Sequence, residues 1–243
     1  MHRSNFRIEG FTERPSPQEL IHLGEQASVP VFEDQGTGCA AHLDEYGIDD
    51  EAYWPDSVSS GLDLVASSGD KLLGGPQCGI LVGKSAIIET IRSNPLYRAF
   101  RVDKLTYAAL EGTLSAYLGG DRESIPVIRM LATQPDTVER RCHIWADALR
   151  SQVLHASVVA TRSLVGGGTT PGASLPSFAV ALEYTGISET TLAARLRRLD
   201  PQIVGRTCDR RVWLDLRTVP EEQDDLLIRR ISAAFLTTSE LEE

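Results

Sequence analysis

Short apolar runs alternate with segments of helical periodicity in the first part of the chain. The runs are typical of short buried strands, and the segments between them are typical of amphipathic helices. We expect strands at residues 29–32, 61–66 and 79–83, helices at residues 16–28 and 84–94, and a short helix just before the second strand. This alternation predicts an α/β sheet whose functional loops lie at the ends of its strands.

The second part of the chain resumes the alternation after one long helix. Residues 103–118 predict that helix, and its expected apolar face consists of Leu105, Ala109, Leu110 and Leu114. We expect the helix to lead away from the first part of the chain. The elements expected after it are helices at residues 135–152, 188–198 and 221–235 and strands at residues 157–161, 177–182 and 211–216. The long helix therefore separates two regions of alternating helices and strands.

Composition and cysteine spacing narrow the class of protein. Hydrophobic residues make up 42% of the chain, which is enough to supply a core. No apolar run is long enough to span a bilayer and no signal-peptide core follows the N-terminus, so we expect no membrane partner and a cytoplasmic location. The four cysteines lie far apart without metal or thioredoxin spacing, so we expect reduced thiols and no metal site.

Charge is unevenly distributed along the chain. The total of 24 basic and 34 acidic side chains gives a net charge of −10, which argues against indiscriminate nucleic-acid binding. Residues 1–98 carry a net charge of −8 and residues 99–243 a net charge of −2. Six arginines gather around one predicted helix end and the following strand: Arg195, Arg197, Arg198, Arg206, Arg210 and Arg211. They fit either contacts to a phosphate backbone or a solvated face balanced by nearby aspartates.

The most informative segment is residues 67–79, Ser-Ser-Gly-Asp-Lys-Leu-Leu-Gly-Gly-Pro-Gln-Cys-Gly, which follows a predicted strand. Its lysine, Lys71, is one of three in the chain, with Lys84 and Lys104. A lysine at the end of a buried strand can form a Schiff base with pyridoxal 5′-phosphate (PLP), while neighbouring hydroxyls and glycine amides hold the phosphate. An ordinary surface lysine is the alternative.

The core of this segment, Gly-Asp-Lys-Leu-Leu-Gly-Gly-Pro-Gln, closely resembles the PLP-lysine motif of the bacterial L-seryl-tRNA(Sec) selenium transferase (selenocysteine synthase) family. Four further segments resemble motifs of that family in the same order. They are His-Arg-Ser-Asn-Phe-Arg-Ile-Glu-Gly-Phe-Thr-Glu at 2–13, Val-Phe-Glu-Asp-Gln-Gly-Thr-Gly at 31–38, Asn-Pro-Leu-Tyr-Arg-Ala-Phe-Arg-Val-Asp-Lys at 94–104, and Gly-Gly-Gly at 166–168 with Ser-Leu-Pro-Ser at 174–177. The resemblance extends over nearly the whole chain.

The resemblance implies the α/β fold of the fold-type I PLP-dependent transferases, which is the aspartate-aminotransferase-like fold. Residues 1–98 would be the C-terminal part of the PLP-binding large domain, and residues 99–243 a small C-terminal α/β domain with its linking helix. Chains of the family are roughly twice as long, so this chain is expected to begin within the cofactor domain and to correspond to the C-terminal half.

The resemblance to this family implies roles for the residues around Lys71. Lys71 would carry the cofactor and, once released from it, act as the base for the substrate's α-proton. Asp34 would pair with the pyridine nitrogen, although it also suits a turn residue before Gln-Gly. Ser68 would bind the cofactor phosphate, and the amides of Gly74 and Gly75 would cradle a phosphate from the same or a neighbouring subunit.

Two arginines form a second candidate set. Arg98 and Arg101 follow Pro95 and lie three residues apart, so that on one helical turn they can face the same way. Paired guanidinium groups suit a phosphate-like anion, and the resemblance implies that they bind selenophosphate. Ion pairs with Asp103 or Glu111 are the alternative.

The resemblance implies PLP-dependent conversion of seryl-tRNA(Sec) to selenocysteyl-tRNA(Sec) with selenophosphate, in a homo-oligomer built from dimers. Two alternatives stay open. One is a related PLP-dependent ammonia-lyase acting on a small amino acid without tRNA. The other is a truncated, non-catalytic fragment or a subunit that needs an N-terminal partner chain.

Overall fold

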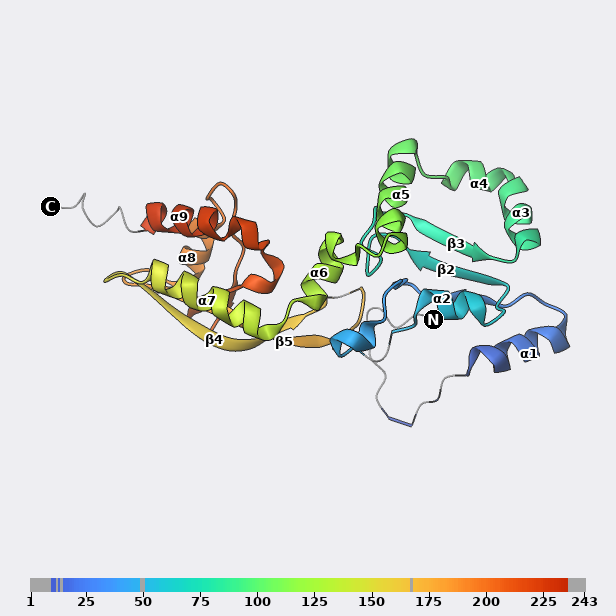
Figure 1. The fold of residues 1–243 in the computed structure, drawn as a ribbon, viewed down its shortest axis with the longest axis horizontal. Coiled ribbons are helices and arrows are strands. Elements are labelled where there is room, and N and C mark those ends of the chain that lie inside the picture. Colours follow the sequence, from blue (N-terminus) through green and yellow to red (C-terminus); the bar gives the residue numbers. More distant parts are fainter. Residues whose placement is uncertain (1–9, 12, 14, 49–50, 167, 236–243) are drawn as a thin grey trace. The chain divides into compact units, whose positions relative to one another are not determined.

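The computed structural model describes residues 10–11, 13, 15–48, 51–166 and 168–235. They fall into two compact units, residues 1–132 with 164–174 and residues 133–163 with 175–243 (Figure 1). The long helix predicted at residues 103–118 belongs to the first of these units. Most of the motif at 2–13, and the middle glycine of 166–168, lie outside the described residues. Within the described part, no helix is both long and apolar enough to span a membrane.

The first unit contains a three-stranded sheet in the order β1-β2-β3, formed by β1 (Phe32–Asp34), β2 (Leu64–Ser68) and β3 (Gly79–Gly83). Strand β1 runs parallel to β2, and β3 runs antiparallel to it. The carboxyl ends of β1 and β2 therefore meet at one edge of the sheet, and the loop of residues 69–78 turns back there into β3. Functional loops are expected at such an edge.

The two faces of this sheet differ in burial. Val65 and Ser67 of β2 are buried, and α2 (Trp54–Ser59) packs against this strand. The opposite face carries Phe32, the register partner of Leu64, and Leu81, the register partner of Ala66. These two side chains are 56% and 42% exposed. Strand alternation thus buries one face and leaves apolar side chains open on the other.

Helix boundaries in the first unit follow local capping. Helix α1 (Pro17–Ala27) begins with a capping box in which Ser16 Oγ accepts the Glu19 amide at 3.2 Å. Asn94 ends α3 (Ser85–Ser93) and caps α4 (Pro95–Phe100), since its side chain accepts the Leu96 amide at 3.0 Å. Pro95 therefore starts a new helix as well as ending the previous one.

Helix α5 (Lys104–Leu118) corrects the predicted apolar face and its direction. Leu110 and Leu114 are half-buried, but Ala109 is exposed and Leu105 is 80% exposed. The helix does not lead away from the first unit, because the side chain of Tyr117 contacts the loop after β2. Three short helices complete this unit: η1 (Leu43–Tyr46), η2 (Arg122–Ser124) and α6 (Pro126–Ala132).

The second unit is a two-layer α/β domain. Its four-stranded sheet has the order β4-β5-β7-β6, with β4 (Leu154–Leu164), β5 (Ser174–Tyr184), β6 (Arg206–Cys208) and β7 (Arg211–Asp215). Helices α7 (Pro135–Leu149), α8 (Glu189–Leu196) and α9 (Asp224–Phe235) cover one face of this sheet (Figure 1). Between β7 and α9 lie the short helices η3 (Leu216–Thr218) and η4 (Glu221–Gln223). Trp145, Val180, Val212 and Ile231 are among the residues of the core between the layers.

A buried ion pair joins two helices of this layer. Arg141 on α7 donates to Asp224 Oδ1 at 2.6 Å and Oδ2 at 2.8 Å, and also to the carbonyl oxygens of Leu216 at 3.0 Å and Val219 at 2.9 Å. Four of the five N–H donors of this guanidinium are hydrogen-bonded, which lets the charge be buried, whereas burying an unpaired guanidinium is costly. The pair therefore fixes the chain between β7 and α9.

Candidate functional site

The structure brings two of the predicted site residues to the same edge of the first sheet. Asp34 is the last residue of β1 and pairs in register with Ala66 of β2. Lys71 follows β2 by three residues, in the loop that leaves the same edge. The exposed carboxylate of Asp34 and the half-buried Lys71 thus lie where two parallel strands end together.

Hydrogen bonds within the loop fix the backbone around Lys71. The Gly69 amide donates to the Cys78 carbonyl at 2.9 Å, which closes the base of the loop. The Gly75 amide donates back to the Gly69 carbonyl at 2.8 Å, and the Gly74 amide donates to the Lys71 carbonyl at 3.0 Å. In this conformation both glycine amides donate to carbonyl oxygens within the turn.

The far side of the loop is held by the end of α5 and the segment after it. Tyr117 Oη donates to the Leu73 carbonyl at 3.1 Å, and burial raises the pKa of this phenol, so it stays a donor. Gly74 has a φ of +75°, and a Cβ there would lie 2.5 Å from Ile125 Cγ2. Only glycine meets both conditions. The side chains of Leu72 and Leu73 are fully buried beneath Lys71.

The turn after β1 packs on the end of β2. Asp34 Oδ1 accepts the Gly36 amide at 3.0 Å, so the aspartate is a turn residue as well as an exposed carboxylate. Gly38 has a φ of +57°, and a Cβ there would lie 2.4 Å from Ser67 Cβ. The turn that carries Asp34 is therefore seated directly on the strand that leads to Lys71.

Several polar atoms surround this edge. Ser68 Oγ donates to Asp70 Oδ1 at 2.7 Å, which makes Asp70 part of the loop structure. Ser67 Oγ and Gln35 Oε1 are buried without a hydrogen-bond partner among the described residues. Gln35 Nε2 donates to Ser57 Oγ of α2 at 2.5 Å. Buried polar atoms without partners are uncommon and mark places where a further polar group can be accommodated.

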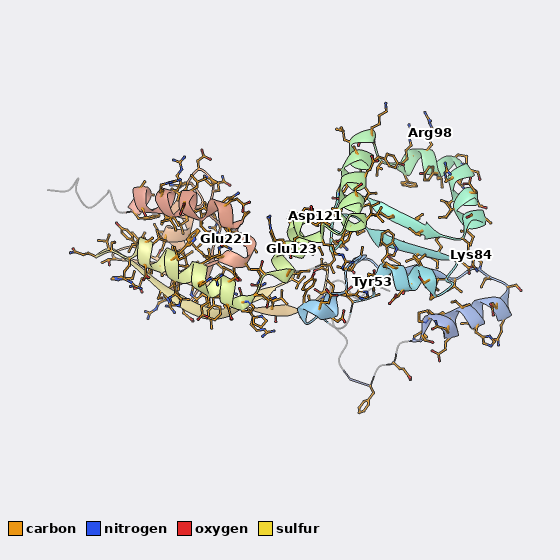
Figure 2. The ribbon with its side chains drawn as sticks, in the orientation of Figure 1. Tyr53, Lys84, Arg98, Asp121, Glu123 and Glu221 are labelled. Atoms are coloured by element: carbon orange, nitrogen blue, oxygen red, sulfur yellow. The ribbon has the colours of Figure 1, made fainter. Side chains whose placement is uncertain are left out.

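The other two lysines are placed differently. Lys84 lies at the opposite edge of the sheet, where its Nζ pairs with Asp63 Oδ1 at 2.7 Å (Figure 2). Asp63 also accepts the Val31 amide at 2.7 Å, and hydrogen bonds from Lys84 and from that amide lower the pKa of the Asp63 carboxyl. Lys104 is exposed at the first position of α5. Lys71 is the lysine that stands on the loop between β2 and β3.

The two arginines predicted to bind an anion lie on a separate element of the first unit. Arg98 is in the last turn of α4 and projects outwards (Figure 2), and Arg101 caps the same helix with extended backbone. Both are exposed, and neither forms an ion pair with Asp103 or Glu111 within the described residues. The structure leaves them available but does not join them to the loop of Lys71.

Some residues at this site were not indicated by the sequence. Tyr117 and Thr113 of α5 contact the loop; a Cβ on Gly75 would lie 3.2 Å from Thr113 Oγ1. The available signal was their four-residue spacing on a predicted helix. Ser67 and Gln35 differ from ordinary strand residues only through burial, which requires the fold.

Comparisons with known proteins agree with this fold. The family model described as L-seryl-tRNA selenium transferase matches residues 1–220. The protein named L-seryl-tRNA(Sec) selenium transferase from Alkaliphilus oremlandii is 41% identical over 94% of this chain and 50% of its own length. The protein of the same name from Aquifex aeolicus is 43% identical over 91% of this chain and 50% of its length. The chain spans about half the length of these curated relatives.

A solved structure gives independent support for the fold. The structure of D-glucosaminate-6-phosphate ammonia-lyase aligns with a TM-score of 0.51 and 19% identity, over 93% of this chain and 54% of that chain. Together with the family match, this confirms the predicted α/β fold of the fold-type I PLP-dependent transferases. The chain belongs to the L-seryl-tRNA selenium transferase family.

Proposed function

We propose that this chain holds PLP on Lys71 and serves in the conversion of seryl-tRNA(Sec) to selenocysteyl-tRNA(Sec), with selenophosphate as the selenium donor. The observation that carries the proposal is the shared position of Lys71 and Asp34 at one sheet edge, on two turns packed against β2. Since the substrate is an aminoacyl-tRNA, we place the reaction in the cytoplasm.

The groups at this edge fit PLP. The cofactor has an aldehyde, a ring nitrogen and a phosphate, and the edge offers an amine, a carboxylate and hydroxyl groups. Lys71 supplies the amine, Asp34 the carboxylate, and Ser68 a hydroxyl. Ser67 Oγ, which has no hydrogen-bond partner in the described part of the chain, is a further polar atom beside the Asp34 turn.

Each residue then has a defined task. Lys71 Nζ would hold the cofactor and, when released from it, would take the α-proton of the seryl group. Asp34 would hold a proton on the ring nitrogen; its Oδ1 already accepts the Gly36 amide. When bound, PLP supplies the electron sink for loss of the α-proton and the β-hydroxyl. The amides of Gly74 and Gly75 shape the turn that presents Lys71, and we do not assign them to a phosphate.

Arg98 and Arg101 remain our candidates for the donor anion. They are exposed cations in the last turn and at the C-cap of α4, an element other than the turns that carry Lys71 and Asp34. We therefore propose that they act in a homo-oligomer of dimers, at a site shared between subunits. Guanidinium groups bind tetrahedral oxyanions through paired hydrogen bonds.

The activity test is formation of selenocysteyl-tRNA from seryl-tRNA(Sec), PLP and selenophosphate, detected by mass spectrometry of the aminoacyl-adenosine. We expect product with the wild-type chain and with Lys84→Ala, and none with Lys71→Ala. Arg98→Gln with Arg101→Gln should raise the selenophosphate concentration required for half-maximal rate.

Two results would overturn the proposal. Release of ammonia from free serine without tRNA would favour a lyase. Absence of product from a folded, PLP-loaded chain would show that this chain does not perform the reaction by itself.

A further inference from the structure

An aromatic and cationic cluster lies on the face of the second sheet that the helices do not cover. Arg211 and Trp213 alternate with the core residues Val212 and Leu214 on β7, so they point away from the helical layer. Arg206 on the neighbouring strand pairs in register with Trp213. The Arg206 Cζ lies 5.1 Å and the Arg211 Cζ 5.9 Å from the Trp213 ring centroid.

Small residues on the central strand make room for this cluster. Ala181 and Ala179 of β5 pair with Trp213 and Asp215 and are fully buried although they lie on the face opposite the helices. Longer side chains at those positions would lift the indole and the guanidinium groups off the sheet. The short alanine side chains therefore leave room above β5 for the larger side chains of the cluster.

Two hydroxyl groups of β4 orient the guanidinium groups. Arg206 Nη2 donates to Thr161 Oγ1, and Arg211 Nη1 donates to Ser157 Oγ at 3.3 Å. A guanidinium carries five N–H donors, so each arginine keeps most of its donors for another acceptor. Stacking on Trp213 and one fixed hydrogen bond reduce the entropy that either arginine would lose on binding an anion.

Among the described residues, no carboxylate lies within ion-pair distance of either arginine. Asp215, on the same face, accepts hydrogen bonds from Ser163 Oγ at 2.5 Å, Ser177 Oγ at 3.0 Å and the Arg217 amide at 3.1 Å. Within the described residues, neither Arg206 nor Arg211 forms an ion pair. Two preoriented cations that have no ion-pair partner in the described part of the chain fit an external anion.

Further arginines lie around β6, at the β6–β7 turn and on α8 in the helical layer on the other face of the sheet. The two-residue turn between β6 and β7 places Arg210 at its exposed tip, with a left-handed φ of 58° that a non-glycine residue seldom adopts. Helix α8 packs against β6, and Arg195, Arg197 and Arg198 are exposed at its carboxyl end. Positive charge is therefore spread along β6 and its neighbours and is not confined to one point.

We propose that Arg206, Arg211 and Trp213 form a docking surface for the sugar–phosphate backbone of RNA, with the guanidinium groups on successive phosphates. This proposal deepens the proposed function, because it assigns part of the tRNA contact to the second unit. An open sheet face with spread cations and hydroxyls fits a polyanion better than a single small phosphate. Sheet faces that carry aromatic and basic side chains are a recurring RNA-binding solution.

The test is binding of an in vitro tRNA(Sec) transcript by the full chain over a range of salt concentrations. Arg206→Gln with Arg211→Gln should weaken binding about tenfold or more and lower the salt slope by roughly 1.5, since about 0.7–0.9 is lost per phosphate contact. The matched control is Arg229→Gln with Arg230→Gln, which removes the same charge from exposed positions on α9. It should change binding less than threefold.

Three outcomes would overturn the proposal: no binding by the wild-type chain, equal weakening by both double variants, or displacement of the transcript by millimolar inorganic phosphate. Hydrogen exchange of β7 peptides should match the wild type in both double variants, and Trp213→Phe, which keeps an aromatic ring, should weaken binding less than the double arginine variant. Labelling of Lys71 by PLP is measured on the same proteins. Lost labelling with retained RNA binding would reject the cofactor proposal alone, and the converse would reject the docking surface alone.

Discussion

Gly38 offers a sharp test of how the Asp34 turn is seated on β2. In Gly38→Ala the new Cβ would lie 2.4 Å from Ser67 Cβ and 2.8 Å from Ser67 Oγ. Ser67 Cβ is bonded to the strand backbone and cannot rotate out of the way, so the turn or the strand must move. We expect this overpacking to destabilise the first unit by about 1–3 kcal/mol. Alanine at a φ of +57° should destabilise it by roughly a further 1–2 kcal/mol.

The matched control is Gly47→Ala. Gly47 has a φ of +76°, but no atom lies within 4 Å of a Cβ built there. Gly47→Ala should therefore lose only the roughly 1–2 kcal/mol of stability that the strained backbone costs. Hydrogen exchange measured by mass spectrometry on β2 peptides reports the local stability of the first unit independently of the second.

A second substitution separates the two contributions in Gly38→Ala. Adding Ser67→Gly removes the clashing Cβ. The double variant should therefore regain the stability lost to overpacking and still lack the stability lost to the strained backbone. Ser67→Gly alone should weaken β2 by roughly 0.5–1 kcal/mol. If Gly38→Ala is no more destabilising than Gly47→Ala, the turn is not packed on Ser67 and the placement of Asp34 derived from it is wrong.

Three further predictions concern contacts away from this turn. Tyr117→Phe removes the bond to the Leu73 carbonyl and should destabilise the loop after β2 by about 1 kcal/mol; unchanged exchange in the loop peptide would contradict it. Arg141→Met leaves a partly buried carboxylate and two carbonyls unpaired, so it should destabilise the second unit by roughly 3–5 kcal/mol in urea unfolding. The control is Arg140→Met at an exposed neighbouring position, which should change the stability by less than about 0.5 kcal/mol. Burial raises the pKa of Cys142 to about 12, so its thiolate is scarce at pH 8 and iodoacetamide should modify it only after unfolding; rapid modification of the native chain would refute this.

Local signals predicted much of the fold. The helices expected from residues 16 and 188 are present, with Ser16 and Ser188 as their N-caps, and the runs around residues 64–68 and 79–83 form strands. These features depend on neighbours within a few residues, so the sequence alone indicates them. The position of Lys71 after β2 follows from the same local pattern.

Features that depend on contacts distant in the sequence were not predictable. Periodicity identified α5 but not the part of it that meets the loop, which is why Leu105 is exposed while Tyr117 makes the contact. Strand β6 has three residues and is defined by its pairing with β7. The stacking of Arg206 on Trp213 depends on that register, so the arginine cluster could be seen in the sequence but not its arrangement.

The measurement closest to the central claim is the site of reductive PLP labelling. The purified chain is incubated with PLP, reduced with borohydride and mapped by peptide mass spectrometry, with Lys71→Ala and Lys84→Ala as paired variants. The account predicts a pyridoxyl adduct on Lys71, lost in Lys71→Ala and kept in Lys84→Ala. An adduct spread over Lys84 and Lys104 and retained in Lys71→Ala, or no adduct in a folded chain, would contradict it.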